Sequence, residues 1–339
     1  MHHPAQAQRR RAMLVIGALL LCAVASLLFA GMTGSIAVPL AEMPDALRQL
    51  ARGDSSLATS LLELRASRAL TAFVTGGALA LAGVMMQALL RNPLADPYVL
   101  GISAGASVGA LLALLLMASA IVVDMAALGG AVAVSMLLYL LARRDLRSGL
   151  ALEAGTSMLL LTGVILSSAC MALVTLMLSI APEGRLRSMI FWMIGDLAGA
   201  PLRLAPWVVL GAALLYALRS ARAMNVVALH AEAAATLGIR VGSLRKGLFL
   251  VSGVLTASAV TSAGSVGFVG LIVPHACRFA FGPDHRVLIP AAVLAGGSFL
   301  VLCDTLARTV IAPQQLPVGA ITAIIGAPVF LYQLHRLRR

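Results

Sequence analysis

Runs of about 20 consecutive, mostly apolar residues recur along this chain of 339 residues, and they constrain its fold more than any other feature. In hydrocarbon every backbone N–H and C=O must be hydrogen-bonded within the protein, so a membrane-crossing chain forms helices or a closed barrel. Barrel strands alternate polar and apolar residues over about 10 positions, and these runs do not alternate. We therefore predict an all-α, polytopic membrane protein.

The scarcity of charge leads to the same class of protein. Only 11% of the residues are charged and 60% are hydrophobic, whereas a soluble domain carries about 25% charged residues. The net charge of +12 is almost entirely arginine placed between apolar runs, as topology determinants are, so we expect no nucleic-acid partner. The four cysteines are dispersed without a CxxC pair, which predicts packing rather than metal binding or disulfides.

Nine apolar segments predict membrane spans, and a shorter tenth one decides the topology. The nine cover about 12–35, 66–90, 97–117, 119–142, 156–180, 202–219, 247–265, 288–307 and 317–334. Residues 267–281 are either a tenth span or a re-entrant element. Ten spans with an inside N-terminus assign 17 of the 25 basic residues to inside segments, as the positive-inside rule requires. We predict ten transmembrane helices, one of them short or partial, in a single domain over residues 1–339 with both termini cytoplasmic.

A charged turn interrupts the apolar sequence between the second and third predicted spans. Its notable residues are Arg91, Asn92, Pro93, Asp96 and Pro97. Each proline lacks a backbone N–H and restricts the residue before it, so the preceding helix has to end there. The small residues that follow, GISAGASVG at 101–109, allow another helix to approach closely. We predict a turn at the cytoplasmic face that is packed against another element.

The longest inside connection, residues 220–246, is predicted to contain a short helix. Leu229, Ala233 and Leu237 recur every four residues and would share one helical face. Asn225 is the predicted N-cap of this helix and Gly238 its predicted C-cap. Such a helix is either a solvated connector or a docking surface, and the spacing alone leaves both open.

Two further observations concern charge at membrane depth and the source of energy. Asp304 and Arg308 are four residues apart in one predicted span, so they share a helical face, and we predict a structural ion pair near its outer end. No two acidic residues lie mid-span as a proton relay would require. The only lysine, Lys246, lies outside any P-loop sequence, so any ATP energy must come from a partner.

Four blocks of sequence, in order, resemble the FecCD-type permease family of ABC importers, which take up iron–siderophore complexes, haem and vitamin B12. The blocks are LLRNPLADPYVLGISAGASVGA at 89–110, GSVGFVGLIVPHACRF at 264–279, DHRVLIPAAVLAGGSFLVLCDTLART at 284–309 and QLPVGAITAIIGAPVFLYQL at 315–334. The resemblance implies ten transmembrane helices in a bacterial inner membrane. It also implies a homodimer of permeases, two cytoplasmic ATP-binding subunits and a periplasmic substrate-binding protein, with membrane lipid around them and no cofactor.

The resemblance also implies roles for particular residues. In the family, the cytoplasmic helices between the sixth and seventh spans dock in the ATP-binding subunit, which implies coupling roles for Leu229, Ala233, Leu237 and Gly238. The family's inner gate lies at the start of the fifth span. The similar segment here, GTSMLLLTGV at 155–164, places Thr156 and Ser157 at the constriction. The outer helix resembles RSMIFWMIGDLAGA at 187–200, where Asp196 departs from the serine of many relatives.

We therefore predict the transmembrane subunit of a binding-protein-dependent, ATP-driven importer without an ATPase site of its own. The expected cargo is a metal chelate, an iron–siderophore complex or haem, with cobalamin as the alternative. Met85, Met86 and Gln87 are candidate pathway residues, although a core or lipid-facing role is equally open for the methionines. An ion-gradient-driven secondary carrier is the alternative of another class. An intramembrane enzyme would need a polar catalytic cluster within the spans, which the sequence lacks.

Overall fold

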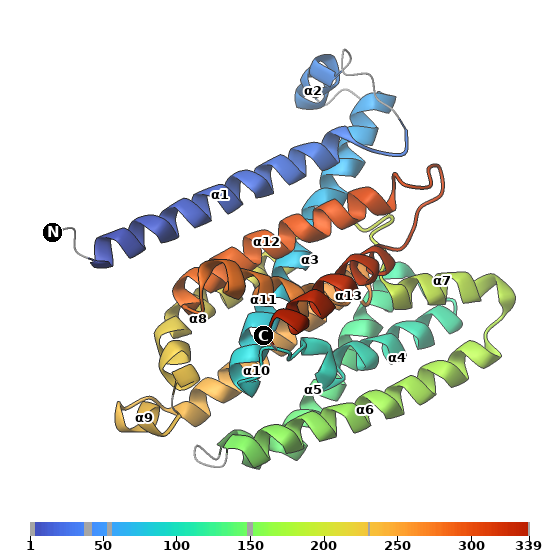
Figure 1. The fold of residues 1–339 in the computed structure, drawn as a ribbon. Coiled ribbons are helices and arrows are strands. Elements are labelled where there is room, and N and C mark those ends of the chain that lie inside the picture. The colour runs from blue at the N-terminus through green and yellow to red at the C-terminus, as the bar shows by residue number, and fades with distance from the viewer. Residues whose placement is uncertain (1–3, 37–42, 53–55, 148–151, 230, 338–339) are drawn as a thin grey trace.

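The computed structural model describes residues 4–36, 43–52, 56–147, 152–229 and 231–337. Every regular element within these ranges is a helix, and none of the described residues forms a strand (Figure 1). The all-α prediction is therefore confirmed for this part of the chain.

A helix lies at each of the ten predicted apolar segments. These helices are α1 (Pro4–Met32), α3 (Leu57–Leu90), α4 (Ile102–Leu115), α5 (Ala120–Arg147), α6 (Leu152–Ile180), α8 (Leu204–Leu229), α10 (Val241–Ala263), α11 (Val269–Phe281), α12 (His285–Ala307) and α13 (Val318–Leu337). Among the described residues, 7 helices are long and apolar enough to cross a membrane. The apolar parts of α4, α11 and α13 are shorter, at 10–17 residues. The chain is a multi-pass membrane protein.

Helix α3 forms the centre of the bundle. Every residue from Thr71 to Gln87 is buried, and α10, α11 and α12 pack along it (Figure 1). Close approach depends on glycine: a Cβ on Gly83 would collide with the carbonyl oxygen of Gly270 in α11. Because lipid provides no hydrophobic drive between helices, such close van der Waals packing holds membrane bundles together.

Helix α3 begins earlier than the predicted span, at Leu57. Ser56 caps it, since the Ser56 hydroxyl accepts the Thr59 backbone N–H at 3.3 Å and the Thr59 hydroxyl accepts the Ser56 backbone N–H at 2.7 Å. This reciprocal arrangement satisfies N–H groups that have no partner within the helix. The cap therefore extends the helix beyond its apolar part.

Helices α1 and α6 lie at the edges of the bundle and expose apolar side chains. Leu21 and Leu28 of α1 are 73% and 63% exposed, and Leu161 and Leu176 of α6 are 56% and 59% exposed. Four short helices complete the fold: α2 (Met43–Arg52), η1 (Pro97–Leu100), α7 (Glu183–Ile194) and α9 (Ala231–Thr236). In a membrane the exposed apolar surfaces contact lipid or another subunit.

Candidate functional site

The charged turn between α3 and α4 is built from two local caps. Arg91 has a left-handed backbone, with φ of 49°, and its N–H donates to the Gln87 carbonyl at the end of α3. Asp96 caps η1, since its Oδ1 accepts the Tyr98 backbone N–H at 2.7 Å. Pro97 is the first residue of η1, where a missing N–H costs nothing. The Arg91 backbone therefore ends one helix, and the Asp96 carboxylate starts the next.

The turn packs against the segment that joins α10 to α11. The Tyr98 hydroxyl accepts the Val266 backbone N–H at 3.1 Å. The Pro97 ring packs tightly against Gly270, since two ring carbons lie 3.0 Å from the position of a Cβ there. Two of the four resembling blocks, far apart in the sequence, therefore meet in space.

The connection between α8 and α10 differs from its prediction. Helix α8 continues through Asn225 to Leu229, and α9 is a separate short helix, so the predicted N-cap at Asn225 is wrong. Leu229 ends α8 and Ala233 lies in α9, so the predicted stripe is divided between two helices. The side chains of both residues lie outside the described part of the structure.

The end of this connection does follow the sequence pattern. Gly238 has φ of +79°, and its N–H donates to the Ala235 carbonyl at 3.0 Å. The Ile239 N–H donates to the Ala234 carbonyl at 3.0 Å. Together these bonds close α9 as a glycine C-cap does. Leu237 is 70% exposed beside the cap, so it is available to another protein.

The predicted gate and pathway residues lie in different surroundings. Thr156 and Ser157 are near the start of α6, and their side chains lie outside the described part of the structure. Met85 and Met86 are 0% exposed in the centre of α3. Gln87 is also buried, and its Nε2 donates to the Leu271 carbonyl at 3.3 Å. These positions favour the core role that the sequence left open for the methionines.

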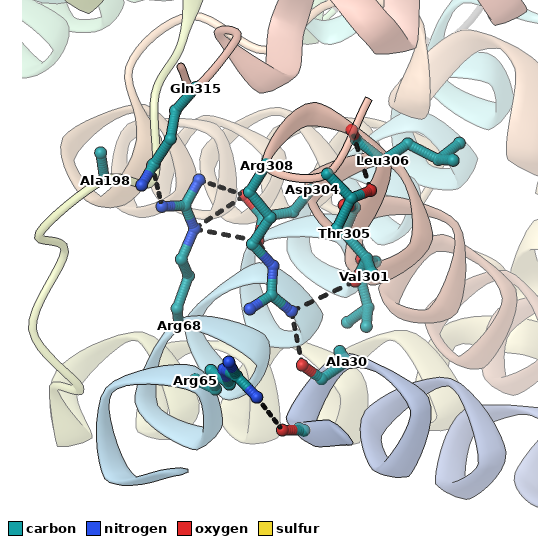
Figure 2. A network of polar contacts seen from close by, with 12 residues as sticks. Ala30, Arg65, Arg68, Ala198, Val301, Asp304, Thr305, Leu306, Arg308 and Gln315 are labelled. Carbon is teal, nitrogen blue, oxygen red and sulfur yellow. Dashed lines mark hydrogen bonds and ion pairs between the residues drawn. The ribbon is translucent and has the colours of Figure 1, made fainter. Parts of the chain in front are cut away.

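A cluster of charged side chains joins α3 and α12 at one end of the bundle (Figure 2). The Arg68 Nε lies 3.0 Å from both carboxylate oxygens of Asp304, and its Nη2 lies 2.8 Å from Oδ1. The Arg68 Nη1 donates to Gln315 Oε1 at 2.7 Å. The predicted pair also forms, but Arg308 Nε lies 3.7 Å from Asp304 Oδ2. Arg68 is therefore the closer partner of the carboxylate.

Two arginines of this region also hold the carboxyl end of α1. The Arg308 Nη2 donates to the Ala30 carbonyl at 2.6 Å. Arg65 donates to the carbonyls of Met32, at 3.3 Å, and Ile36. Guanidinium groups at the carboxyl end of a helix satisfy free carbonyls and stabilise the helix dipole. The cluster therefore attaches the peripheral α1 to α3 and α12.

An apolar cavity of about 750 Å³ lies between α5, α8 and α10. Asp124 and Arg203 line it and form an ion pair with each other. Among the predicted residues whose side chains the structure describes, Met85, Met86, Gln87 and Leu237 do not line this cavity.

Comparison with known proteins identifies the family. Residues 18–336 match the FecCD transport family. The chain belongs to this family. FecCD proteins are permease subunits of ABC importers, and this chain is one of them.

Individual relatives of the chain are named for vitamin B12 uptake. It is 41% identical over 277 residues to the cobalamin import system permease protein BtuC of Halobacterium salinarum, which covers 80% of this chain and 72% of the relative. It is 38% identical over 282 residues to the vitamin B12 import system permease protein BtuC of Escherichia coli, which covers 82% of this chain and 84% of the relative.

Solved structures share the FecCD fold. A transporter assigned to the metal-chelate type of ABC transporters, solved in an inward-facing conformation, aligns with a TM-score of 0.79 and 28% identity. The alignment covers 96% of this chain and 99% of that one. PsaBC from Streptococcus pneumoniae aligns with a TM-score of 0.54 and 16% identity over 86% of this chain and 95% of its own, which shows likeness of fold.

Within this FecCD permease, sequence reasoning missed the partners that lie far away in the chain. Arg68 and Asp304 are 236 positions apart, so helical spacing could not pair them, although both lie in predicted spans and buried charges need partners. Asn225 was assigned to its own helix, whereas its side chain binds residues 284 and 285.

Proposed function

We propose that this FecCD permease imports cobalamin or a closely related corrinoid. The observation that carries the proposal is the identity of 38% over 82% of the chain with a permease named for vitamin B12 import, together with the 41% identity to a second one. These relatives favour the alternative that the sequence offered over its first expectation, an iron–siderophore complex or haem. The chelated metal is cargo here.

The working assembly is proposed to contain two copies of this chain, two cytoplasmic ATP-binding subunits and a periplasmic substrate-binding protein. The family supports the ATP-binding and substrate-binding partners. The exposed leucines of α6 provide apolar surface for a second copy. We place the assembly in a bacterial inner membrane with ten spans per chain and both termini cytoplasmic, in accord with the basic residues of the inside segments.

Import is proposed to follow alternating access. Closure of the ATP-binding subunits displaces residues 220–246, where the exposed Leu237 and the turn at Gly238 form part of the contact. Helix α10 begins at Val241 and packs along α3, α5 and α8, so the displacement reaches the bundle core directly. Thr156 and Ser157 then act as the inner gate, and the cargo passes between the two permeases.

The hydrogen bond between Tyr98 and Val266 includes the charged turn between α3 and α4 in this movement. It joins the turn between α3 and α4 to the segment that follows α10. A shift of α10 therefore carries the start of α4 with it, and α4 packs against α6, which bears the predicted gate. Rigid helices joined by such contacts transmit a displacement at one end to the other.

The cargo is tested by uptake into proteoliposomes that contain this chain with its cognate ATP-binding subunit. Radiolabelled cyanocobalamin, a ferric siderophore and haem are supplied separately, each with the cognate substrate-binding protein. We expect ATP-dependent accumulation of cyanocobalamin alone. A metal chelate of another type is the second candidate, favoured by the likeness to the metal-chelate-type transporter, and selective uptake of the siderophore or haem would establish it instead.

A further inference from the structure

Asn225 connects two helices through both the nitrogen and the oxygen of its side-chain amide. Its Nδ2 donates to Asp284 Oδ1 at 2.7 Å, and its Oδ1 accepts the backbone N–H of His285 at 2.9 Å. The same oxygen lies 2.7 Å from His285 Nδ1. A backbone N–H can only donate, so the amide oxygen has to face His285 and the amide nitrogen has to face Asp284. Only asparagine in this orientation satisfies both sides.

The two partners of Asn225 form the first turn of α12. Asp284 is the N-cap, and its Oδ1 also accepts the Arg286 backbone N–H at 3.0 Å. Desolvation alone would raise the pKa of the Asp284 carboxyl. The hydrogen bonds from Arg286 and Asn225, with nearby positive charge, outweigh it and hold the pKa below its ordinary value. The carboxylate is therefore ionised at neutral pH.

The position of this junction between α8 and α12 suggests more than a cap. On one side, Asn225 lies near the end of α8, which leads into α9 and the segment proposed to contact the ATP-binding subunit. On the other side, α12 runs from the buried His285 along α3 to Asp304, the carboxylate that binds Arg68. The Asn225 side chain thus connects residues 220–246, the proposed coupling segment, to α12, which reaches the opposite end of the bundle.

We propose that Asn225 is a positioning residue for import, which makes the coupling segment and α12 move together when the ATP-binding subunits close. The inference rests on the proposed function, because it takes residues 220–246 as the segment that these subunits displace. Without the Asn225 contacts, the end of α8 and α9 can move while the start of α12 stays behind. ATP hydrolysis then continues with less transport.

The junction permits a reciprocal test. Asn225→Asp keeps an acceptor for His285 but removes the donor to Asp284 and places two carboxylates against each other. Adding Asp284→Asn moves the amide to the other side and restores one donor and one acceptor between the two positions. Asp284→Asn alone keeps an acceptor oxygen for the Arg286 N–H, so it serves as the control for the change at position 284.

Two quantities are measured in proteoliposomes of the assembled transporter: cyanocobalamin imported per ATP hydrolysed, and the stimulation of ATP hydrolysis by the cognate binding protein. We expect Asn225→Asp to reduce both by about fivefold while the complex remains assembled, and the double variant to restore them. A merely structural role would lower thermal stability and leave the ratio of transport to hydrolysis unchanged. That outcome, or a double variant that restores nothing, would overturn the inference.

A second variant covers the case in which Asn225→Asp does not assemble. Asn225→Ser removes the amide without adding charge and is expected to show the same loss of coupling, so wild-type coupling in this variant also overturns the inference. The experiment tests the proposed cargo and the proposed role of Asn225 independently. If wild-type transporter imports no cyanocobalamin, the proposed cargo is wrong, whereas stimulation of ATP hydrolysis by the binding protein still tests Asn225.

Discussion

At the scale of single residues, Asp304 is the charge on which one end of the bundle depends. It is 1% exposed and is the carboxylate shared by Arg68 and Arg308, which are themselves buried. We expect Asp304→Asn to destabilise the protein by about 3–5 kcal/mol, because removing one partner leaves buried charges without compensation. Thermal unfolding of the purified chain in detergent measures the effect.

The Asp124–Arg203 ion pair provides a matched control for this prediction. Its side chains are 22% and 38% exposed, compared with 1% for Asp304 and 11% for Arg68. Asp124→Asn makes the same chemical change where solvent screens the charge, and we expect a loss of less than about 1 kcal/mol. Equal losses in the two variants would show that burial of the Asp304 cluster contributes nothing to stability.

At the scale of elements, the length of the apolar segments predicted where the helices lie. Local capping residues predicted the helix ends less well. Each predicted apolar segment became a helix because satisfying the backbone in hydrocarbon leaves little alternative. The end of α9 followed from Gly238, whose positive φ is a local property. The predicted start of a helix at Asn225 was wrong, because the Asn225 amide binds Asp284 and His285 at the start of α12 and does not cap a helix of its own. The periodic spacing of apolar residues does not predict contacts between segments that are far apart in the sequence.

The same scale gives a prediction for the coupling segment. Leu237 is 70% exposed, so Leu237→Arg changes no buried contact and is expected to alter stability by less than about 0.5 kcal/mol. A charge inserted into an apolar docking contact is costly, so we expect binding of the ATP-binding subunit to weaken by about tenfold or more. Surface plasmon resonance with the purified subunit measures the affinity.

Leu57→Arg is the control for the coupling prediction. Leu57 is 77% exposed and begins α3, beside the connection that the topology places outside. The substitution is chemically identical but lies on the predicted outer side, so affinity for the ATP-binding subunit is expected to stay at the wild-type value. If Leu57→Arg weakens binding as much as Leu237→Arg, residues 220–246 are not the specific contact.

At the scale of the whole molecule, the source of energy separates an importer subunit from a stand-alone carrier. A gradient-driven carrier needs titratable or ion-binding groups within its spans, and the buried carboxylate Asp304 is instead held by two arginines. We expect vesicles containing this chain alone to accumulate no cyanocobalamin under a proton or sodium gradient, and uptake to begin only when the ATP-binding subunit, its binding protein and ATP are present. An ATP-binding subunit that binds but does not hydrolyse ATP provides the control and should support at most one round of transport per complex. Sustained accumulation by the chain alone would place it among secondary carriers despite its fold, because the membership of a family does not by itself fix the energy source.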